Sequence, residues 1–368
     1  MVNWWRLTGV VGLAAGAIAA GAGAVVMAEK IAVGRIRLGP DPAAGEPFRA
    51  GAGDRDGSAE EITVLADDGL PLHVQLSGPA AAPVTLVFCH GYCLSADVWY
   101  YQRAWFESSY RCVLFDQRSH GRSGRSDPEL VSIDQLGADL HAILEAVTPG
   151  DAPVVLIGHS MGGMTIMALA DQHPELFGRK VIGAALISTA ASTIDPVAWL
   201  PGLIRPAVRR AMPSMMTGAS KGRIADVVEQ GRQSASDIAF LGTRYLAFGD
   251  SKASPTVVDF LERIIRATPI DVIADFYVAL VGHEKRHALK VLGNIPVLVL
   301  TGDKDRLVDP GLADDIADSI AGAELVKVHG AGHVVILERP QEVNVAIAAE
   351  VARALARYRG DDVGSPRR

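Results

Sequence analysis

The stretch Val154–Ala170, VVLIGHSMGGMTIMALA, changes its hydrophobic pattern in the middle. A strand-like apolar run stops at Gly158, and apolar residues resume with a different period after Gly162. Between them, Ser160 stands in the sequence G-H-S-M-G. Because a sharp strand-to-helix turn needs glycines where side chains would clash, the stretch predicts a nucleophile elbow that holds the Ser160 hydroxyl at a helix N-terminus. A serine N-cap flanked by glycines is the alternative.

A serine hydroxyl is a weak nucleophile that needs a base to remove its proton and an acid to orient that base. Asp305 lies in VLVLTGDKDRLVDP, just beyond an apolar run, and His333 lies in HGAGHVVILERP, beyond the next run. Loops at the carboxyl ends of parallel strands share one edge of a sheet. Ser160, Asp305 and His333 are therefore predicted to meet there. Three neighbouring residues are rivals for the acid and base roles: Asp303, Asp309 and His329.

Short apolar runs recur along the chain and alternate with stretches of helical spacing, for example 133–147 and 164–173. A hairpin pattern, EITVLA and PLHVQLSG around an Asp-Asp-Gly turn, precedes them. The runs lie at 84–88, 112–115, 154–158, 181–188, 296–302 and 324–328. Fully apolar runs are typical of parallel strands covered on both faces. The fold class is therefore predicted as α/β, with a mostly parallel central sheet of about eight strands.

One interval breaks this alternation and divides the chain. From 191 to 294 no comparable strand run appears, and scattered apolar residues at helical spacing predict an inserted helical cap after the sixth strand. The core is predicted in two parts, and proline and glycine favour a linker before the first. The predicted segments are a hydrophobic anchor or signal (1–30), the linker (31–60), the core (61–190 and 295–358), the cap (191–294) and a tail (359–368).

The N-terminal segment Gly9–Ala28 contains no charged residue over 20 positions. This length suits one bilayer crossing, and Trp4 and Trp5 suit an interfacial belt. The sequence therefore predicts membrane association through one N-terminal segment, on an unassigned side of the membrane. Export after signal cleavage, with small residues Val26 and Ala28 before the cut, is the main alternative, and a buried or peripheral helix is the third.

Composition excludes some classes of function and weakens others. A net charge of −7 provides no basic surface for nucleic acid. Cys89, Cys93 and Cys112 are not spaced like a zinc site and are predicted to be reduced and buried. His283 to His287 matches the zinc-protease pattern H-E-x-x-H, but neighbouring basic residues disfavour a cation, so a solvated helix is predicted instead. No metal or cofactor is expected.

Four motifs resemble those of the α/β-hydrolase family, over roughly residues 61 to 358. They are His90-Gly91-Tyr92, DQRSHGRS at 116–123, GHSMGG at 158–163, and the acid and base loops around Asp305 and His333. The resemblance implies that the backbone N–H of Tyr92 joins that of Met161 in an oxyanion hole. It also implies that His90 and His120 are turn residues rather than bases. Ser119 stands where the family usually has glycine.

The predicted function is that of a serine hydrolase that cleaves small-molecule carboxylic esters through an acyl-enzyme. Ser160 argues against epoxide opening or halide removal, which in this family use aspartate. Methionines in the predicted cap, Met212, Met215 and Met216, favour a lipid-like or medium-chain acyl ester. A thioesterase, an acyltransferase, a cofactor-free perhydrolase, a C–C bond hydrolase and a non-catalytic binding module remain alternatives. The sequence predicts no oligomeric state.

Overall fold

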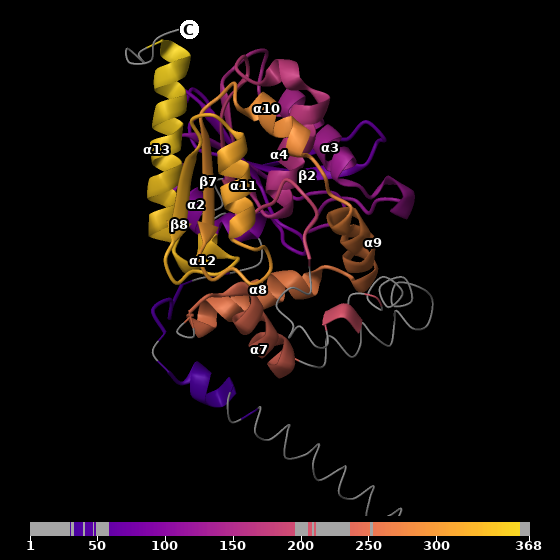
Figure 1. Cartoon of the computed structure of the whole chain (residues 1–368), viewed down its shortest axis with the longest axis vertical. Helices are drawn as coiled ribbons and strands as arrows, with labels where there is room; N and C mark the ends of the chain where they lie inside the picture. Colours follow the sequence, from indigo (N-terminus) through magenta and orange to yellow (C-terminus); the bar gives the residue numbers. More distant parts are fainter. Residues whose placement is uncertain are drawn as a thin grey trace, which may run out of the picture.

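The centre of the protein is an eight-stranded sheet with the order β1-β2-β4-β3-β5-β6-β7-β8. Figure 1 shows β7 and β8 of this sheet beside helix α13 (Pro340–Arg359). The computed structural model describes residues 30, 33–39, 41–46, 48, 59–195, 205–207, 210, 236–250 and 253–360. The strands are β1 (Glu60–Leu65), β2 (Pro71–Ser77), β3 (Thr85–Cys89), β4 (Arg111–Phe115), β5 (Val154–His159), β6 (Val181–Ile187), β7 (Val297–Gly302) and β8 (Glu324–Val328). β2 pairs antiparallel with β1 and β4, and all other neighbours are parallel. The predicted α/β class and mostly parallel sheet are confirmed.

Helices connect these strands and cover the sheet. The longer helices before β6 are α2 (Tyr100–Phe106), α3 (Ile133–Val147) and α4 (Met161–Gln172). The described elements between β6 and β7 are α7 (Ser236–Ala247), α8 (Pro255–Ala267), α9 (Ile270–Val281), η4 (Arg286–Ala288) and α10 (Leu289–Leu292). The chain continues with α11 (Gly311–Ser319), α12 (Val335–Glu338) and α13 (Pro340–Arg359). The cap and the domain boundaries stay predictions.

Side chains of the central strands alternate between two apolar layers. In β3, Leu86 and Phe88 face one layer, while Val87 and Cys89 face the other, and all four are fully buried. Helices α2 and α13 complete the first layer, and α3, α4 and α11 complete the second. This two-residue period explains why the central strands β3, β5 and β6 are almost entirely apolar, whereas the edge strand β8 is partly exposed and carries Glu324 and Lys327.

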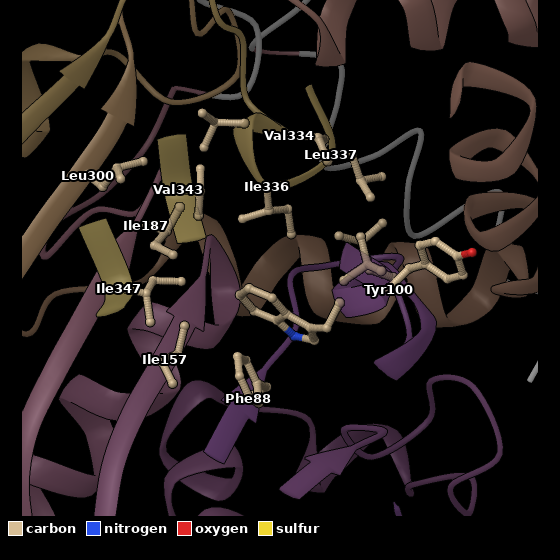
Figure 2. Packing of buried hydrophobic residues seen from close by; sticks show 14 of the residues in the cluster. Phe88, Tyr100, Ile157, Ile187, Leu300, Val334, Ile336, Leu337, Val343 and Ile347 are labelled. Carbon is tan, nitrogen blue, oxygen red and sulfur yellow. The ribbon is translucent and has the colours of Figure 1, made fainter. Parts of the chain in front are cut away.

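The layer under α13 is a continuous block of branched side chains. Figure 2 shows Ile157 of β5 and Ile187 of β6 beside Ile347 of α13, and all three are fully buried. Burying one such side chain contributes about 1.5–3 kcal/mol relative to leaving it exposed. The layer therefore fixes the strands whose ends carry the predicted site.

The described part of the predicted linker packs against the core. Val33, Ala43 and Phe48 are buried, and the ring of Phe48 stacks on Phe260 of α8 with a centroid distance of 4.4 Å. An Asp41 carboxylate oxygen accepts a hydrogen bond of 3.2 Å from the backbone N–H of Thr256, in the first turn of α8. We call residues 33–48, where described, the N-terminal strap.

The localisation predicted from the N-terminal segment is corrected. Within the described residues, no helix combines the length and apolar character that a bilayer crossing requires. Helix α13 has 20 residues, but its faces carry charged side chains such as Glu342, Arg353 and Arg357. The described residues therefore do not support the predicted membrane association. Residues 9–28 themselves lie outside the described residues.

Glu350 of α13 gives the fold a testable pH dependence. It is fully buried, its Oε2 contacts Arg353, and its Oε1 has no hydrogen-bond partner among the described residues. Burial raises the pKa of this carboxyl from 4.5 to about 7. Because the unfolded chain ionises first, the contribution of Glu350 to stability falls as pH rises from 4.5 to about 7.

The free energy of unfolding of Glu350→Gln, minus that of the wild type, should therefore be larger at pH 8 than at pH 4.5. The expected change in this difference in the free energy of unfolding is up to about 3 kcal/mol. Urea unfolding of both proteins at the two pH values measures it. Curves that shift in parallel with pH would contradict the raised pKa.

Candidate active site

The turn from β5 into α4 presents Ser160 in a strained backbone conformation. Ser160 has φ 53° and ψ −118°, a region that costs a non-glycine residue on the order of 1–3 kcal/mol. Its N–H donates to the Ile187 carbonyl at 2.8 Å, and its carbonyl accepts from Thr189 Oγ1 at 2.7 Å. Bonds to the end of β6 and the residues just beyond it thus hold the turn in place.

Gly162 brings α4 against the end of β3. A Cβ at this position would lie 2.0 Å from the carbonyl oxygen of Cys89, so only glycine fits. The helix N-terminus and the loop after β3 are consequently neighbours. This close approach is the structural reason for the second glycine of the motif.

The structure brings Ser160, His333 and Asp305 into one hydrogen-bonded chain. Ser160 Oγ lies 3.1 Å from His333 Nε2, and His333 Nδ1 lies 2.8 Å from Asp305 Oδ2. The other Asp305 oxygen accepts from the N–H groups of Leu307 and Val308 at 2.8 and 2.9 Å. The Asp305 side chain is fully buried, so these donors compensate for the water it has lost.

The rival residues lie elsewhere. Asp303 pairs with His329 at 2.9 Å, and the His329 side chain is 94% exposed. Asp309 accepts a hydrogen bond of 2.8 Å from the N–H of Gly311 at the start of α11. None of the three takes part in the hydrogen-bonded chain that reaches Ser160.

Two backbone donors lie beside Ser160. Gly91 approaches so closely that a Cβ there would lie 3.1 Å from the Cβ of Ser160, which places the segment Gly91-Tyr92 next to the serine. Within the part of the chain that the structure describes, the N–H groups of Tyr92 and Met161 donate to no protein acceptor. The phenol of Tyr92 donates to the Ile273 carbonyl of α9.

His90 and His120 hydrogen-bond the backbone, as predicted. His90 Nδ1 donates to the carbonyl of Gly91 at 2.8 Å. His120 Nδ1 donates to the Arg118 carbonyl at 2.9 Å, and its Nε2 accepts from the Cys93 N–H at 3.2 Å. Burial lowers the pKa of both rings, that of His120 to about 3. Both are therefore neutral and support the turns beside the serine.

The structure accommodates Ser119 at a position where the family usually has glycine. Its φ is 65°, a left-handed conformation in which glycine is usual. The Ser119 hydroxyl accepts a hydrogen bond of 2.9 Å from the Ser126 N–H. This bond offsets part of the cost of a side chain at positive φ, and the turn is retained.

A cavity of about 260 Å³ lies between Ser160 and the helices of the β6–β7 connection. Its described lining is mostly apolar and includes Leu261 and Ile265 of α8, and Tyr277 and Leu280 of α9. No described lining residue is an aspartate, glutamate, lysine or arginine. The methionines of the predicted cap, residues 212, 215 and 216, lie outside the described residues.

The H-E-x-x-H stretch is not a helix, which corrects that prediction. Helix α9 ends at Val281, and the short η4 begins only at Arg286. His283 is buried and its Nε2 donates to the Ala190 carbonyl at 3.1 Å, whereas His287 contacts a different group, the carboxylate of Asp171, at 2.7 Å. The two rings therefore have separate partners.

The geometry agrees with comparisons to known proteins. The family model described as alpha/beta hydrolase fold matches residues 84–340. The chain belongs to the α/β-hydrolase family, as the motifs predicted.

Relatives and solved structures extend over most of the chain. A 3-oxoadipate enol-lactonase 2 from Acinetobacter baylyi is 28% identical over 79% of this chain and 96% of its own. An sn-1-specific diacylglycerol lipase, ABHD11, from Mus musculus is 27% identical over 77% of this chain and 86% of its own. The crystal structure of esterase RhEst1 from Rhodococcus sp. ECU1013 is 22% identical with a TM-score of 0.63, over 80% of this chain and 98% of its own. This last likeness concerns the fold.

Gly162→Ala tests the close approach at the elbow, with Gly242→Ala as its control. The new methyl group at 162 would lie 2.0 Å from the Cys89 carbonyl oxygen. We therefore expect either little folded protein or a free energy of unfolding that is lower by about 1–3 kcal/mol or more, the cost of overpacking. Among the described residues, a Cβ at Gly242 of α7 would meet nothing within 4 Å, so the free energy of unfolding of that variant should rise by about 0.5–1 kcal/mol. Thermal unfolding compares them, and equal stabilities would contradict the geometry.

Proposed function

We propose that this protein is a serine hydrolase that cleaves carboxylic esters, with Ser160, His333 and Asp305 as its catalytic residues. The observation that carries the proposal is the chain of hydrogen bonds from Ser160 through His333 to Asp305, beside two N–H groups that donate to no other described group. The broad class, an ester hydrolase of the α/β-hydrolase type, follows from the family. The names of the enol-lactonase and the lipase, which both describe ester cleavage, agree with it.

The geometry supports acyl transfer in two halves. Ser160 Oγ attacks the ester carbonyl while its proton passes to His333 Nε2, 3.1 Å away. Asp305 holds Nδ1–H of the ring and stabilises the imidazolium. The N–H groups of Tyr92 and Met161 would hold the oxyanion, and the imidazolium returns the proton to the leaving alcohol. Water, activated by the same ring, then hydrolyses the acyl-enzyme.

The cavity favours an uncharged substrate of moderate size. Its described lining is apolar and without formal charge, so a carboxylate or ammonium group would lose water there without a partner. At about 30 Å³ per water-sized group, a volume of about 260 Å³ holds on the order of nine non-hydrogen atoms. We therefore propose a medium-chain acyl ester, rather than a long lipid chain, as the substrate class.

A fluorophosphonate probe tests the nucleophile. The wild type should gain one adduct by intact mass, and Ser160→Ala should gain none and lose turnover by roughly 10⁴-fold or more. No adduct on a folded wild type would favour a non-catalytic binding module. An adduct that persists in Ser160→Ala would place the nucleophile elsewhere.

A series of p-nitrophenyl esters tests the substrate class. The value of kcat/KM should rise with acyl length to about six to eight carbons and fall for about twelve or more, because the apolar cavity is then full. Leu261→Trp, which fills the cavity from α8, should move the optimum to shorter acyl groups. A flat profile, or a preference for acyl groups that carry a carboxylate, would contradict the apolar cavity as the acyl site.

A further inference from the structure

The loop that carries His333 is short and leaves the position of the ring to be fixed by other parts of the fold. β8 ends at Val328 and α12 begins at Val335, so His333 lies in the connection between them. A general base must lie within hydrogen-bond reach of the proton it takes, and a misplacement of about 1 Å can cost on the order of 100-fold in rate. The peptide groups on either side of His333 therefore need fixed partners.

His159 supplies the first partner. Its Nε2 lies 2.9 Å from the carbonyl oxygen of His333. The ring is fully buried, and burial lowers its pKa to about 3, so it is neutral. A carbonyl only accepts, hence the proton of His159 sits on Nε2 and points at His333. Since His159 precedes Ser160 directly, this bond ties the nucleophile strand to the base loop.

Glu338 supplies the second partner. Its side chain is 1% exposed, and its Oε2 accepts from the Gly332 N–H at 2.7 Å and from the Gly249 N–H at 3.1 Å. Its Oε1 accepts from the Asp250 N–H at 3.0 Å. One buried carboxylate thus joins the residue before His333 to the loop that follows α7.

The end of α7 contributes a third contact through its backbone. The Val334 N–H donates to the Ala247 carbonyl at 3.0 Å. The two loops are so close that a Cβ on Gly249 would lie 2.5 Å from the Ala331 carbonyl carbon. Ala247 also lines the cavity, so the same contact joins the base loop to the cavity wall.

We infer that His159 and Glu338 are positioning residues of the proposed base: His159 holds the peptide group that follows His333, and Glu338 holds the backbone N–H of Gly332, the residue before it. This inference rests on the proposed function. With the backbone held on both sides of His333, the ring has little room to shift, and its contacts to Ser160 and Asp305 define the side-chain torsions. Removing either positioning residue leaves the catalytic groups present but poorly aligned. The loss should therefore fall on kcat.

The first test compares His159→Leu with His159→Gln. The glutamine amide restores an N–H donor near the His333 carbonyl, whereas leucine keeps only the bulk. Leucine should lower kcat for p-nitrophenyl butyrate about 10- to 100-fold with KM within about twofold, and glutamine should recover most of the loss. His283→Leu is the matched control, because His283 is also a buried ring that donates to a backbone carbonyl, that of Ala190. It should leave kcat unchanged.

The second test compares Glu338→Gln with Glu350→Gln. At position 338 the amide places an NH₂ group against at least one backbone N–H, so kcat should fall about 10-fold or more. At position 350 the change removes a buried carboxylate of α13 that contacts neither loop, so kcat should be unchanged.

Hydrogen–deuterium exchange of the peptide spanning 329–334 provides a readout without turnover. Exchange there should be faster in His159→Leu and Glu338→Gln, and close to the wild type in His159→Gln. Unchanged exchange, or equal losses of kcat in His159→Leu and His159→Gln at matched Tm, would overturn the positioning roles. Faster exchange in the two variants, together with no ester turnover by the wild type, would retain the positioning of the loop and reject the proposed function.

Discussion

The contact between Gly162 and the carbonyl of Cys89 is the constraint on which the site depends. It places the N-terminus of α4 against the end of β3, and Ser160, with φ 53°, lies in the turn just before this helix. Because β3 and β5 are neighbours in the sheet, the same contact sets the segment after β3 beside the serine. Two N–H donors and one hydroxyl are thus brought together by backbone packing, without any charged group. The placement of Ser160 beside the two N–H groups is consequently a property of the sheet and of helix α4.

The sequence was sufficient where chemistry follows from periodicity. Every apolar run became a strand within one or two residues. In the central strands no polar face interrupts the run, because both faces are buried, whereas the edge strand β8 is partly exposed. Ser160, Asp305 and His333 were identifiable because each follows such a run, and the structure joins them by hydrogen bonds. Their catalytic roles rest on the proposal and its tests.

Other features had no comparable signal in the sequence. The partners of His159 and Glu338 are backbone atoms from distant segments, so neither side chain stands out by type or spacing. The strap lies in a segment predicted as a linker because of its glycines and prolines. Its three buried apolar residues are scattered among them and show no helix or strand period. The membrane prediction rested on the local hydropathy of residues 9–28 and on the neighbouring Trp4 and Trp5. Hydropathy cannot distinguish an anchor from other apolar segments of the same length.

The strap and the cavity share one helix. Phe48 stacks on Phe260 of α8, and the same helix presents Leu261 and Ile265 to the cavity beside Ser160. A change in the position of α8 would therefore alter both the packing of Phe48 and the volume of the cavity. Thermodynamic linkage is reciprocal. If a ligand favours one position of α8, it changes the free energy of strap packing by the same amount as strap packing changes the free energy of ligand binding. A ligand that favoured one position of α8 would therefore be coupled to the packing of the strap, although the strap lies outside the cavity.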